Sequence, residues 1–355
     1  MSLFGKIFSH KSILGVDIGT TSIKIVKLKS GKKPELEDYA ILESYRHFER
    51  ANETIQTSNL KMLDKTTTEF LQQAIKNLDV KNTEVVASVQ AFSAFVTLLE
   101  LPLMSAEETA NAMNFQAKQY IPLPLSEVTI DWVKAGEKTD ESGKNIQQVL
   151  LVSVPNEIIK KYENIFQAAG LNLVALEVEG LSLARALTAH SPELTLIVDI
   201  GSRSTSILIA QRGFLKFMSQ TDFAGGSLTQ NLASGTGLAP IEAEMLKRER
   251  GLAIGAGTQL STLMLPIADV ILNEVRQVKD NFEKTYKEKV AKVVLSGGGA
   301  NLTGLDGYFS RQLGLSAVKA DALSAISYPE ELKPLVSELN PALAIAIGLA
   351  MRNIK

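Results

Sequence analysis

The chain has 355 residues, a formal net charge of -2, three histidines and no cysteine. The lack of cysteine excludes disulfides and thiolate metal sites, the three scattered histidines argue against zinc, and the near-neutral charge argues against bulk binding of nucleic acid. The length favours two domains of similar size, and the sequence has neither an apolar stretch of about 18 residues nor a signal-peptide pattern, so a cytoplasmic protein is expected.

The first half opens with three short apolar runs separated by tight turns. Residues 13–16, 23–28 and 36–42 therefore predict an antiparallel meander. Residues 43–58 are polar and irregular, and we interpret them as a loop. Residues 60–78 have apolar side chains at helical spacing, which predicts a surface helix on the sheet. The first eight residues of the chain mix apolar and basic groups, but so short a segment buries too little area to anchor in a membrane alone.

The middle of the chain continues with further strands and helices. Ser105 and Glu108 have the spacing of a capping box, which predicts a helix that runs to Tyr120. The segment from residue 104 to about 145 interrupts the plan of the first half and is interpreted as an insertion. The remaining expected strands are 85–89, 92–101, 128–133, 147–154 and 171–178, and the remaining expected helices are 156–169 and 180–187.

The second half repeats the plan of the first. Pro240 suits the first position of a helix that continues to Arg250. Ile271 to Tyr286 has apolar residues on one face of a long helix. The other expected elements are strands at 194–200, 205–211, 214–219 and 290–295, and helices at 224–233, 301–313 and 340–350.

A loop motif occurs in both halves. Asp17 to Lys24 and Asp199 to Ser206 each contain an aspartate at a strand end, then a glycine and small hydroxyl residues. Backbone N–H groups in such turns form an anion site, and the hydroxyls add donors. An aspartate repels phosphate but suits the waters of a phosphate-bound Mg²⁺. The repeat predicts two loops that grip one metal-phosphate group from opposite sides, and Ser296 to Ala300 adds a third glycine-rich loop.

Two antiparallel meanders followed by helices, with these three loops, resemble the superfamily of actin, hexokinase and heat-shock chaperone ATPases. The resemblance implies an α/β fold with two repeated domains and mixed sheets around a nucleotide cleft. The domains are expected at 1–190 and 191–355. The helices at 180–187 and 340–352 resemble its connecting segments, and the last helix is expected to cross back at the hinge.

Within the superfamily, the sequence most resembles the PilM family of type IV pilus assembly proteins. The resemblance is carried by Gly15 to Leu28, by Gln119 to Pro124 with Asp131, and by Val198 to Gly201. Gly225-Gly226 followed by Gly237-Leu238 and by Glu242 to Lys247 also matches. The resemblance implies an accessory subdomain of the kind found in FtsA, inserted at about 104–174.

The family implies that ATP and Mg²⁺ bind between the two halves. It also implies that the N-terminal peptide of the membrane protein PilN docks in a groove beside the accessory subdomain. The protein would then link the membrane complex to the pilus motor ATPase and other assembly proteins, with its own membrane contact indirect. Self-association is a further possibility, and the short tail after the last helix argues against FtsA itself.

The resemblance also assigns roles to individual residues. Asp17 and Asp199 would hold Mg²⁺ through water, although an aspartate that caps a turn is the competing interpretation of each. Lys24 would reach the phosphates as a point charge, unless it is an exposed strand lysine. The expected nucleotide contacts are Gly19, Thr20, Thr21, Lys24, Gly201, Ser202, Gly225, Gly226, Glu244, Lys247, Gly298 and Gly299.

Two further assignments, that of Glu244 with Lys247 and that of Glu179, also have plain structural alternatives. Glu244 and Lys247 match a ribose and adenine contact of the superfamily, but at this spacing they also fit an ordinary helix ion pair worth about 0.3 kcal/mol. Glu179 is the candidate that orients the attacking water for hydrolysis, but a glutamate is also favoured at a helix N-terminus by the helix dipole. A nucleotide-dependent scaffold with slow ATPase activity at most is expected.

Two other functions stay open. A small-molecule kinase of the superfamily needs a catalytic aspartate in the cleft, and residues 94–102 are apolar without one. A filament-forming protein similar to FtsA or MreB would sediment with ATP in the absence of membrane partners.

Overall fold

The computed structural model describes residues 12–43, 60–81, 83–139, 143–252 and 259–352. The first eight residues and nearly all of the predicted loop at 43–58 lie outside these ranges.

The first sheet consists of the predicted meander followed by two parallel strands. Its order is β3-β2-β1-β4-β8, with β2 antiparallel to both β1 and β3, and with β4 parallel to β1 and β8. β1 is buried along almost its whole length, because helices cover the faces of the sheet. The strands are β1 (Ser12–Ile18), β2 (Ser22–Lys29), β3 (Glu35–Glu43), β4 (Glu84–Val89) and β8 (Asn172–Val178).

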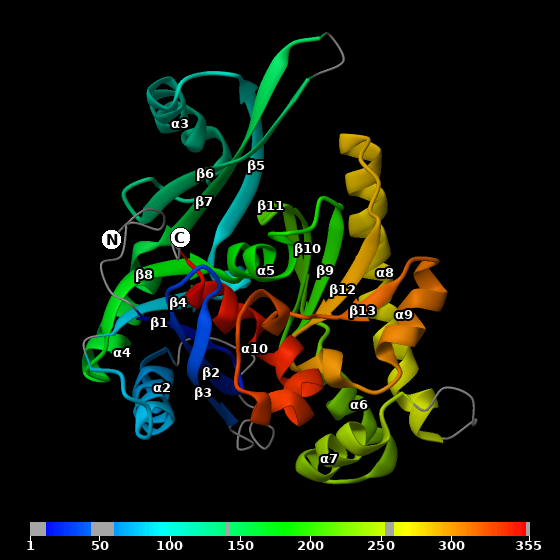
Figure 1. Cartoon of the computed structure of the whole chain (residues 1–355). Coiled ribbons are helices and arrows are strands. Elements are labelled where there is room, and N and C mark those ends of the chain that lie inside the picture. Colours follow the sequence, from blue (N-terminus) through cyan, green and yellow to red (C-terminus); the bar gives the residue numbers. More distant parts are fainter. Residues whose placement is uncertain (1–11, 44–59, 82, 140–142, 253–258, 353–355) are drawn as a thin grey trace.

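Two helices pack on this sheet and on each other: α2 (Leu60–Ile75) and α4 (Asn156–Ala168). In α4, Ile159, Tyr162 and Phe166 are buried at the helical spacing expected from the sequence. Both helices lie at the lower left of Figure 1. The predicted helix at 60–78 is therefore present and ends three residues earlier.

A smaller unit projects away from the two larger sheets (Figure 1). Its sheet has the order β5-β7-β6, and all its pairs are antiparallel. The predicted capping box is present, because the Glu108 N–H donates to the Ser105 hydroxyl while the Ser105 N–H donates to the Glu108 carboxylate. The elements are β5 (Phe95–Pro102), α3 (Ala106–Tyr120), β6 (Val128–Thr139) and β7 (Asn145–Pro155).

This accessory unit differs in extent from the expected insertion at about 104–174. Its first strand, β5, begins at Phe95, and its last strand, β7, ends at Pro155. The next two elements, α4 and β8, are part of the first half of the molecule and not of the accessory unit. α4 packs on α2, and β8 pairs with β4 of the first sheet. Residues 140–142, between β6 and β7, lie outside the described residues.

The second sheet repeats the topology of the first. Its order is β11-β10-β9-β12-β13, with an antiparallel meander followed by two parallel strands. The short strand β13 was not predicted. The strands are β9 (Thr195–Ile200), β10 (Thr205–Gln211), β11 (Phe214–Thr221), β12 (Lys292–Ser296) and β13 (Ala317–Lys319). The sheet-level repeat expected from the two loop motifs is therefore present.

Helices cover the second sheet as well. Pro240 is the first residue of α7, as predicted. The short helix η2 (Gly298–Asn301) precedes α9 (Leu305–Leu313), so this α-helix begins four residues after its expected start. The other helices of this half are α6 (Gly225–Thr236), α7 (Pro240–Arg250) and α8 (Gln259–Tyr286).

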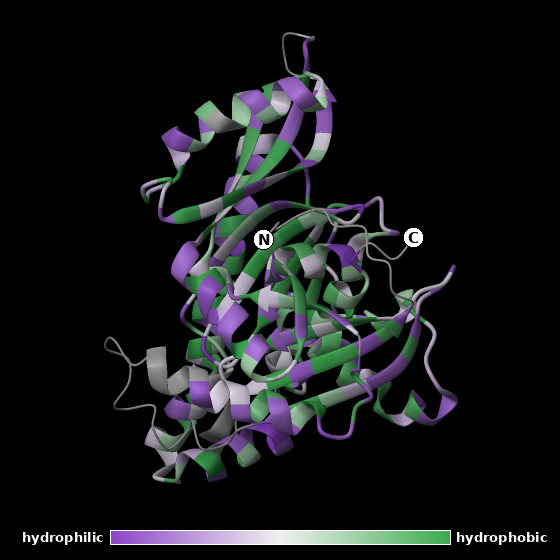
Figure 2. Ribbon diagram, turned by 90° about the vertical axis from the view of Figure 1, so that its left-hand side faces the viewer, coloured by the Kyte–Doolittle hydropathy of each residue, from purple (hydrophilic) through white to green (hydrophobic). Residues whose placement is uncertain are grey.

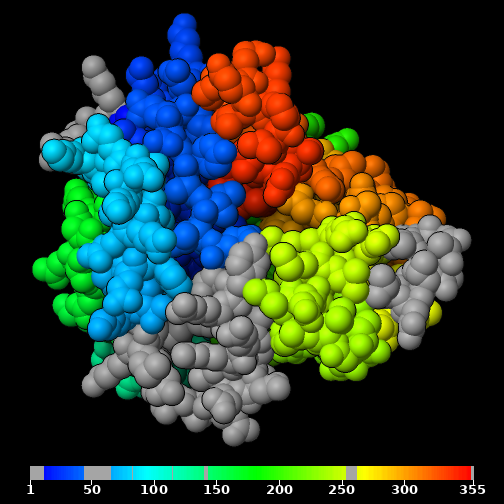
Figure 3. Space-filling model, turned by 90° about the horizontal axis from the view of Figure 1, so that it is seen from below, coloured from blue at the N-terminus to red at the C-terminus, as the bar shows by residue number. Residues whose placement is uncertain are grey.

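Two helices connect the halves, α5 (Glu179–Thr188) and α10 (Val336–Ala350). They cross so closely that a Cβ atom added to Gly348 would lie 2.1 Å from the Ser182 carbonyl oxygen. A Cβ on Gly15 of β1 would lie 2.0 Å from the Ala346 carbonyl oxygen, so α10 packs equally closely on the first sheet. In Figure 3 the red C-terminal segment adjoins the blue N-terminal strands.

The last helix begins at Val336 and not at residue 340 as predicted, and Pro341 lies inside it. Pro341 lies beyond the first turn of the helix, so it removes one backbone hydrogen bond there. The segment Glu330–Ala350 is long and apolar enough to cross a membrane by length and composition, contrary to the sequence expectation. However, 56% of its most apolar window is buried, as in the core helix of a folded domain.

One hydrophobic core joins the two halves. Ile197 and Leu208 of the second sheet share a cluster with Val16 of the first sheet and with Leu343 and Ile347 of α10. The second sheet has a further core on its other face, and the accessory unit has its own. Figure 2 shows hydrophobic segments along the central strands and hydrophilic ones on outlying helices and loops.

Candidate functional site

The two repeated loops have the same turn geometry. The Gly19 N–H donates to the Ser22 carbonyl at 2.9 Å, and the Gly201 N–H donates to the Ser204 carbonyl at 3.0 Å. These turns join β1 to β2 and β9 to β10, so they occupy equivalent positions in the two sheets. Both turns line one cleft between the halves.

The cleft gathers many of the predicted site residues, but not all of them. Its lining consists of Asp17, Gly19, Thr20, Thr21, Ser22, Lys24, Gln90, Phe92, Glu179, Asp199, Gly201, Ser202, Arg203, Ser204, Ser206, Gly297 and Ile345. Six predicted contacts lie outside this lining: Gly225, Gly226, Glu244, Lys247, Gly298 and Gly299.

Asp17 at the end of β1 is held by its own half of the molecule. The Ser88 hydroxyl donates to Asp17 Oδ1 at 2.9 Å, and Lys24 Nζ lies 3.6 Å from Asp17 Oδ2. Asp17 is 2% exposed. Lys24 faces the cleft, as expected, and its charge is partly balanced by Asp17.

Asp199 is the equivalent residue of the second sheet and has an unsatisfied oxygen. Its Oδ1 is buried and has no hydrogen-bond partner among the described residues. Burial raises the pKa of Asp199 to about 6; Lys24 and the Ser296 hydroxyl oppose the shift and Asp17 adds to it. A buried oxygen without a partner calls for a water or a cation at this position.

Glu179 lies at the N-terminus of α5, where its side chain reaches the cleft. The Ala91 N–H donates to Glu179 Oε2 at 3.3 Å. Burial raises the pKa of Glu179 well above its usual value, and the charges of Asp17 and Asp199 raise it further. A cation bound nearby would favour the ionised form of Glu179, which is the form that can act as a base.

The donor set fits a magnesium ion that arrives with a phosphate. Among the described residues, no group of three acidic, histidine or cysteine side chains lies close enough to hold a metal ion directly. Asp17 and Asp199 can instead accept hydrogen bonds from water bound to Mg²⁺, which usually keeps several of its waters. A cation between the carboxylates would also offset their mutual repulsion.

The N-terminus of α6 supports the second loop from below. The Gly225 N–H donates to the Gly201 carbonyl at 3.0 Å, and the Gly226 N–H donates to the Ser202 carbonyl at 2.8 Å. A Cβ on Gly226 would lie 2.6 Å from that Ser202 oxygen. These two N–H groups are thus engaged by the loop, and a direct nucleotide contact by either glycine stays a prediction.

Glu244 and Lys247 form a buried ion pair on α7. Lys247 Nζ lies 2.6 Å from Glu244 Oε2 and donates to the Gly225 carbonyl at 2.9 Å. Burial raises the pKa of Glu244, but Lys247 and the hydrogen bonds from Thr229 and Arg248 outweigh burial and lower it. This geometry matches the ion-pair alternative, and the contact with ribose and adenine stays a prediction.

The third glycine loop packs against the second sheet. Gly297 has φ +80, and its N–H donates to the Pro341 carbonyl at 2.9 Å. A Cβ on Gly299 would lie 2.4 Å from Ile200 Cγ2, whereas Gly298 has open space beside it. Of the two predicted adenine contacts, Gly298 therefore has room for a ligand and Gly299 is needed for packing.

Several residues in or next to this cleft were given no role by the sequence analysis, among them Ser88, Gln90, Phe92 and Arg203. Gln90 Nε2 donates to the Ile18 carbonyl at 3.0 Å, and Ser88 supports Asp17 as described. The ring of Phe92 lies 5.0 Å from the guanidinium carbon of Arg203 across the cleft. Polar residues at the carboxyl end of the strand at 85–89 were the available signal, because ligands in α/β sheets bind at that edge.

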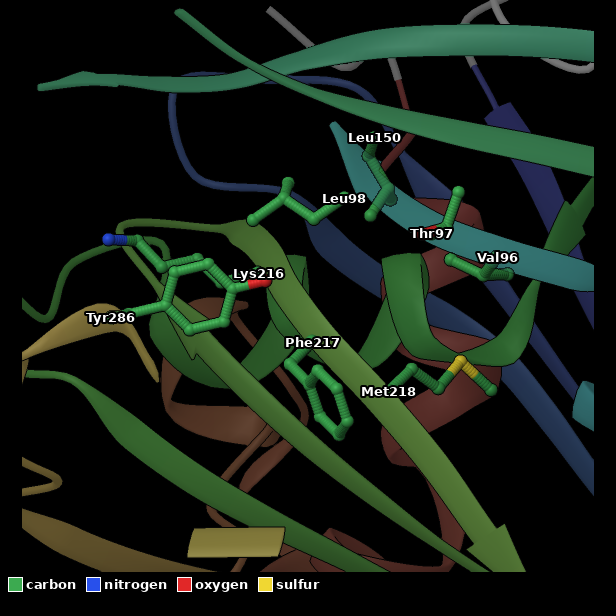
Figure 4. A pocket seen from close by; sticks show the side chains of 8 residues that line it. All are labelled: Val96, Thr97, Leu98, Leu150, Lys216, Phe217, Met218 and Tyr286. Carbon is green, nitrogen blue, oxygen red and sulfur yellow. The ribbon is translucent and has the colours of Figure 1, made fainter. Parts of the chain in front are cut away.

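A second hollow lies between the accessory sheet and the second sheet (Figure 4). Lys138 Nζ of the accessory unit lies 5.5 Å from the centroid of the Tyr286 ring and 2.6 Å from Glu100 Oε1. The accessory unit thus contacts the second half of the chain as well as the first. The hollow is lined by Val96, Thr97, Leu98, Leu150, Lys216, Phe217, Met218 and Tyr286.

Comparison with known proteins identifies a family and a fold. The family described as "Type IV pilus assembly protein PilM" matches residues 15–354. The cell division protein FtsA of Escherichia coli strain K12 is 30% identical over 118 residues, which cover 32% of this chain and 28% of FtsA. The chain thus matches less than a third of the length of this curated relative.

Two solved structures share the fold over nearly the whole chain. A chain of the PilM-PilN type IV pilus biogenesis complex superposes with a TM-score of 0.81 and 21% identity, covering 97% of this chain and 98% of that one. MreB 5 of Spiroplasma citri bound to AMPPNP gives a TM-score of 0.55 and 11% identity, covering 96% and 95%. The predicted actin-like ATPase fold is confirmed.

Proposed function

Because this chain belongs to the PilM family of type IV pilus assembly proteins, we propose that it is an ATP-binding scaffold that docks the N-terminal peptide of PilN. The proposal places it in the cytoplasm at the inner membrane, linked to the membrane through this partner. The scaffold links PilN to the pilus motor, and its own ATP hydrolysis is slow at most.

The observation that carries nucleotide binding is the pair of matched turns beside two buried aspartates. The turns at Gly19 and Gly201 face one cleft, and Asp199 Oδ1 is buried there without a partner among the described residues. Thr20, Thr21 and Ser202 offer hydroxyl and backbone donors to phosphate oxygens. In this role Asp17 and Asp199 hold Mg²⁺ through water, and the ion supplies charge balance for the phosphates.

Glu179 is the proposed orienting residue for hydrolysis. Its side chain lines the cleft, and burial and the charges of two neighbouring carboxylates raise its pKa well above the usual value. A bound cation would oppose that shift and favour the ionised form, which can accept a hydrogen bond from an attacking water.

PilN docking rests on the family and on the complex that its solved relative forms. The relative in question is a chain of the PilM-PilN type IV pilus biogenesis complex. In the proposal, the peptide occupies a groove beside the accessory unit, so that its affinity depends on the nucleotide state of the cleft.

The test is fluorescence anisotropy of a labelled PilN N-terminal peptide, titrated with wild type and Asp17→Ala protein, with and without Mg-ATP. We expect saturable binding that changes with nucleotide in the wild type only. Asp79→Ala is the control, because this exposed aspartate lies outside the cleft. Absence of peptide binding under every condition would contradict the scaffold.

The kinase and the filament-forming protein remain the competing functions. The carboxylates of the described cleft lining are Asp17, Glu179 and Asp199, all of which this proposal already uses. Steady phosphorylation of a small hydroxylated substrate would favour the kinase. Filaments that sediment with ATP in the absence of PilN would favour the filament protein.

A further inference from the structure

We propose that Arg203 recognises the terminal phosphate of a bound nucleoside triphosphate, so that the protein distinguishes a triphosphate from a diphosphate. The inference rests on the nucleotide binding proposed above and names the residue that makes that binding selective.

Arg203 lies in the second of the two matched turns. The turn joins β9 to β10, and Arg203 lines the cleft between Ser202 and Ser204. The first turn has Thr21 at the corresponding position, two residues after its glycine. The repeat is therefore asymmetric at this point, and only the second loop brings a guanidinium group to the cleft.

The guanidinium group has no polar partner among the described residues. No hydrogen bond or ion pair is made by Arg203 within that part of the chain, and its side chain is exposed. Its contact is with the face of the Phe92 ring, at 5.0 Å from the centroid. An arginine stacked on an aromatic ring keeps its five in-plane N–H donors for other groups.

The charge balance of the cleft favours an anion at this group. Asp17 partly neutralises Lys24, whose Nζ lies 3.6 Å from Asp17 Oδ2. Among the residues that the structure describes, Arg203 has no such carboxylate, so in the described lining it is the cation that remains for the ligand. A guanidinium group binds a phosphate through two parallel hydrogen bonds, which a lysine cannot reproduce.

The contact between Arg203 and Phe92 also spans the two halves of the chain. Phe92 belongs to the short helix η1 (Ala91–Ser93) after β4 of the first sheet, and it is 43% exposed. The aromatic ring thus holds the guanidinium group at the mouth of the cleft before any ligand binds. Phe92 acts as a positioning residue. Whether Arg203 reaches a terminal phosphate therefore depends on the relative position of the two halves.

The experiment is isothermal titration of ADP and of a non-hydrolysable ATP analogue, each with Mg²⁺, into wild type, Arg203→Ala, Arg203→Lys and Phe92→Leu proteins. Arg203→Ala should weaken binding of the analogue by about 10- to 100-fold and binding of ADP by less than about threefold. Arg203→Lys should restore part of the loss. Phe92→Leu should weaken the analogue by about threefold and leave ADP unchanged.

Arg311→Ala is the matched control, because Arg311 is an exposed arginine on α9 outside the cleft lining. An equal loss for both nucleotides in Arg203→Ala, or unchanged affinity for the analogue, overturns the inference. If wild-type protein binds neither nucleotide, the proposed nucleotide-binding function itself fails, and that result is distinct from the first two. Unchanged melting temperatures establish that the variants are folded.

Discussion

Arg248 on α7 forms a two-pronged ion pair with Glu43, the last residue of β3, at 3.1 and 3.4 Å. The same guanidinium group donates through Nε to Glu244 Oε1 at 2.8 Å. Arg248 thus joins the first sheet to α7, whose Lys247 donates to the Gly225 carbonyl at the start of α6.

The coupling between Glu43 and Arg248 should be small in thermodynamic terms. Their side chains are 34% and 51% exposed, and exposed pairs contribute about 0.2–1 kcal/mol. A double-mutant cycle of Glu43→Gln and Arg248→Met, measured by urea denaturation, should give a coupling of that size that shrinks at high salt. A coupling above about 3 kcal/mol would mean that the pair is shielded from solvent.

The contribution of Asp199 to the stability of the protein, in the absence of divalent cations, should fall as the pH rises from about 4 to 6. Asp199 has a folded pKa of about 6, above an unfolded value of about 3.9, so in this window the folded state binds more protons than the unfolded state. The loss amounts to about 3 kcal/mol in the free energy of unfolding. Asp199→Asn removes this titration.

Urea denaturation in the presence of a chelator measures this effect. The free energies of unfolding of Asp199→Asn and of the wild type should be most similar near pH 4. The free energy of unfolding of Asp199→Asn should then rise relative to that of the wild type up to about pH 7. Asp79→Asn, an exposed aspartate, provides the control. A difference between wild type and Asp199→Asn that is constant with pH would contradict the assignment.

Glu177→Gln should destabilise the protein strongly. Glu177 is buried and accepts two 2.8 Å hydrogen bonds from Arg185, while Arg352 Nε lies 3.6 Å away. Removal of the carboxylate weakens both hydrogen bonds from Arg185 and takes away one of the two carboxylates, with Asp131, whose charge favours the charged form of Arg352, at a cost of about 3–5 kcal/mol. Glu331→Gln, at an exposed glutamate, should change the free energy of unfolding by less than about 0.5 kcal/mol. Equal denaturation midpoints for the two variants would contradict this role.

Gly348→Ala should lower the stability of the protein, whereas Gly298→Ala should not. The first places a Cβ 2.1 Å from the Ser182 carbonyl oxygen, so the two connecting helices must separate, at a cost of about 1–3 kcal/mol or more. The second meets open space and should leave stability unchanged or slightly raised. Thermal denaturation of both variants checks the pair, and similar melting temperatures would contradict the close crossing.

Much of the fold was predictable from local patterns. The strands at 12–18 and 195–200 are apolar runs that end in an aspartate and a glycine turn, so their equivalence was visible in the sequence. β13 was not, because three residues that include a lysine carry no periodic signal. The start of α10 was misplaced because Pro341 resembles a first helical residue.

The cleft was predictable only in part, for a physical reason. A repeated motif predicts two similar turns, and the structure brings Asp17 and Asp199 to one cleft. The stacking of Arg203 on Phe92 depends on the relative position of the two halves, which the local sequence does not encode. The occupation of the Gly225 N–H by the Gly201 carbonyl likewise depends on the docking of α6 on the loop.

The packing of α10 on the first sheet also constrains the order in which the protein folds during synthesis. Gly15 of β1 lies against Ala346 of α10, although β8, the last strand of that sheet, ends at Val178. At about 5–20 residues per second, a ribosome needs on the order of 10–30 s to make the chain between Val178 and Ala350. α10 therefore cannot bury its part of the apolar face of the N-terminal sheet until translation has reached the last helix.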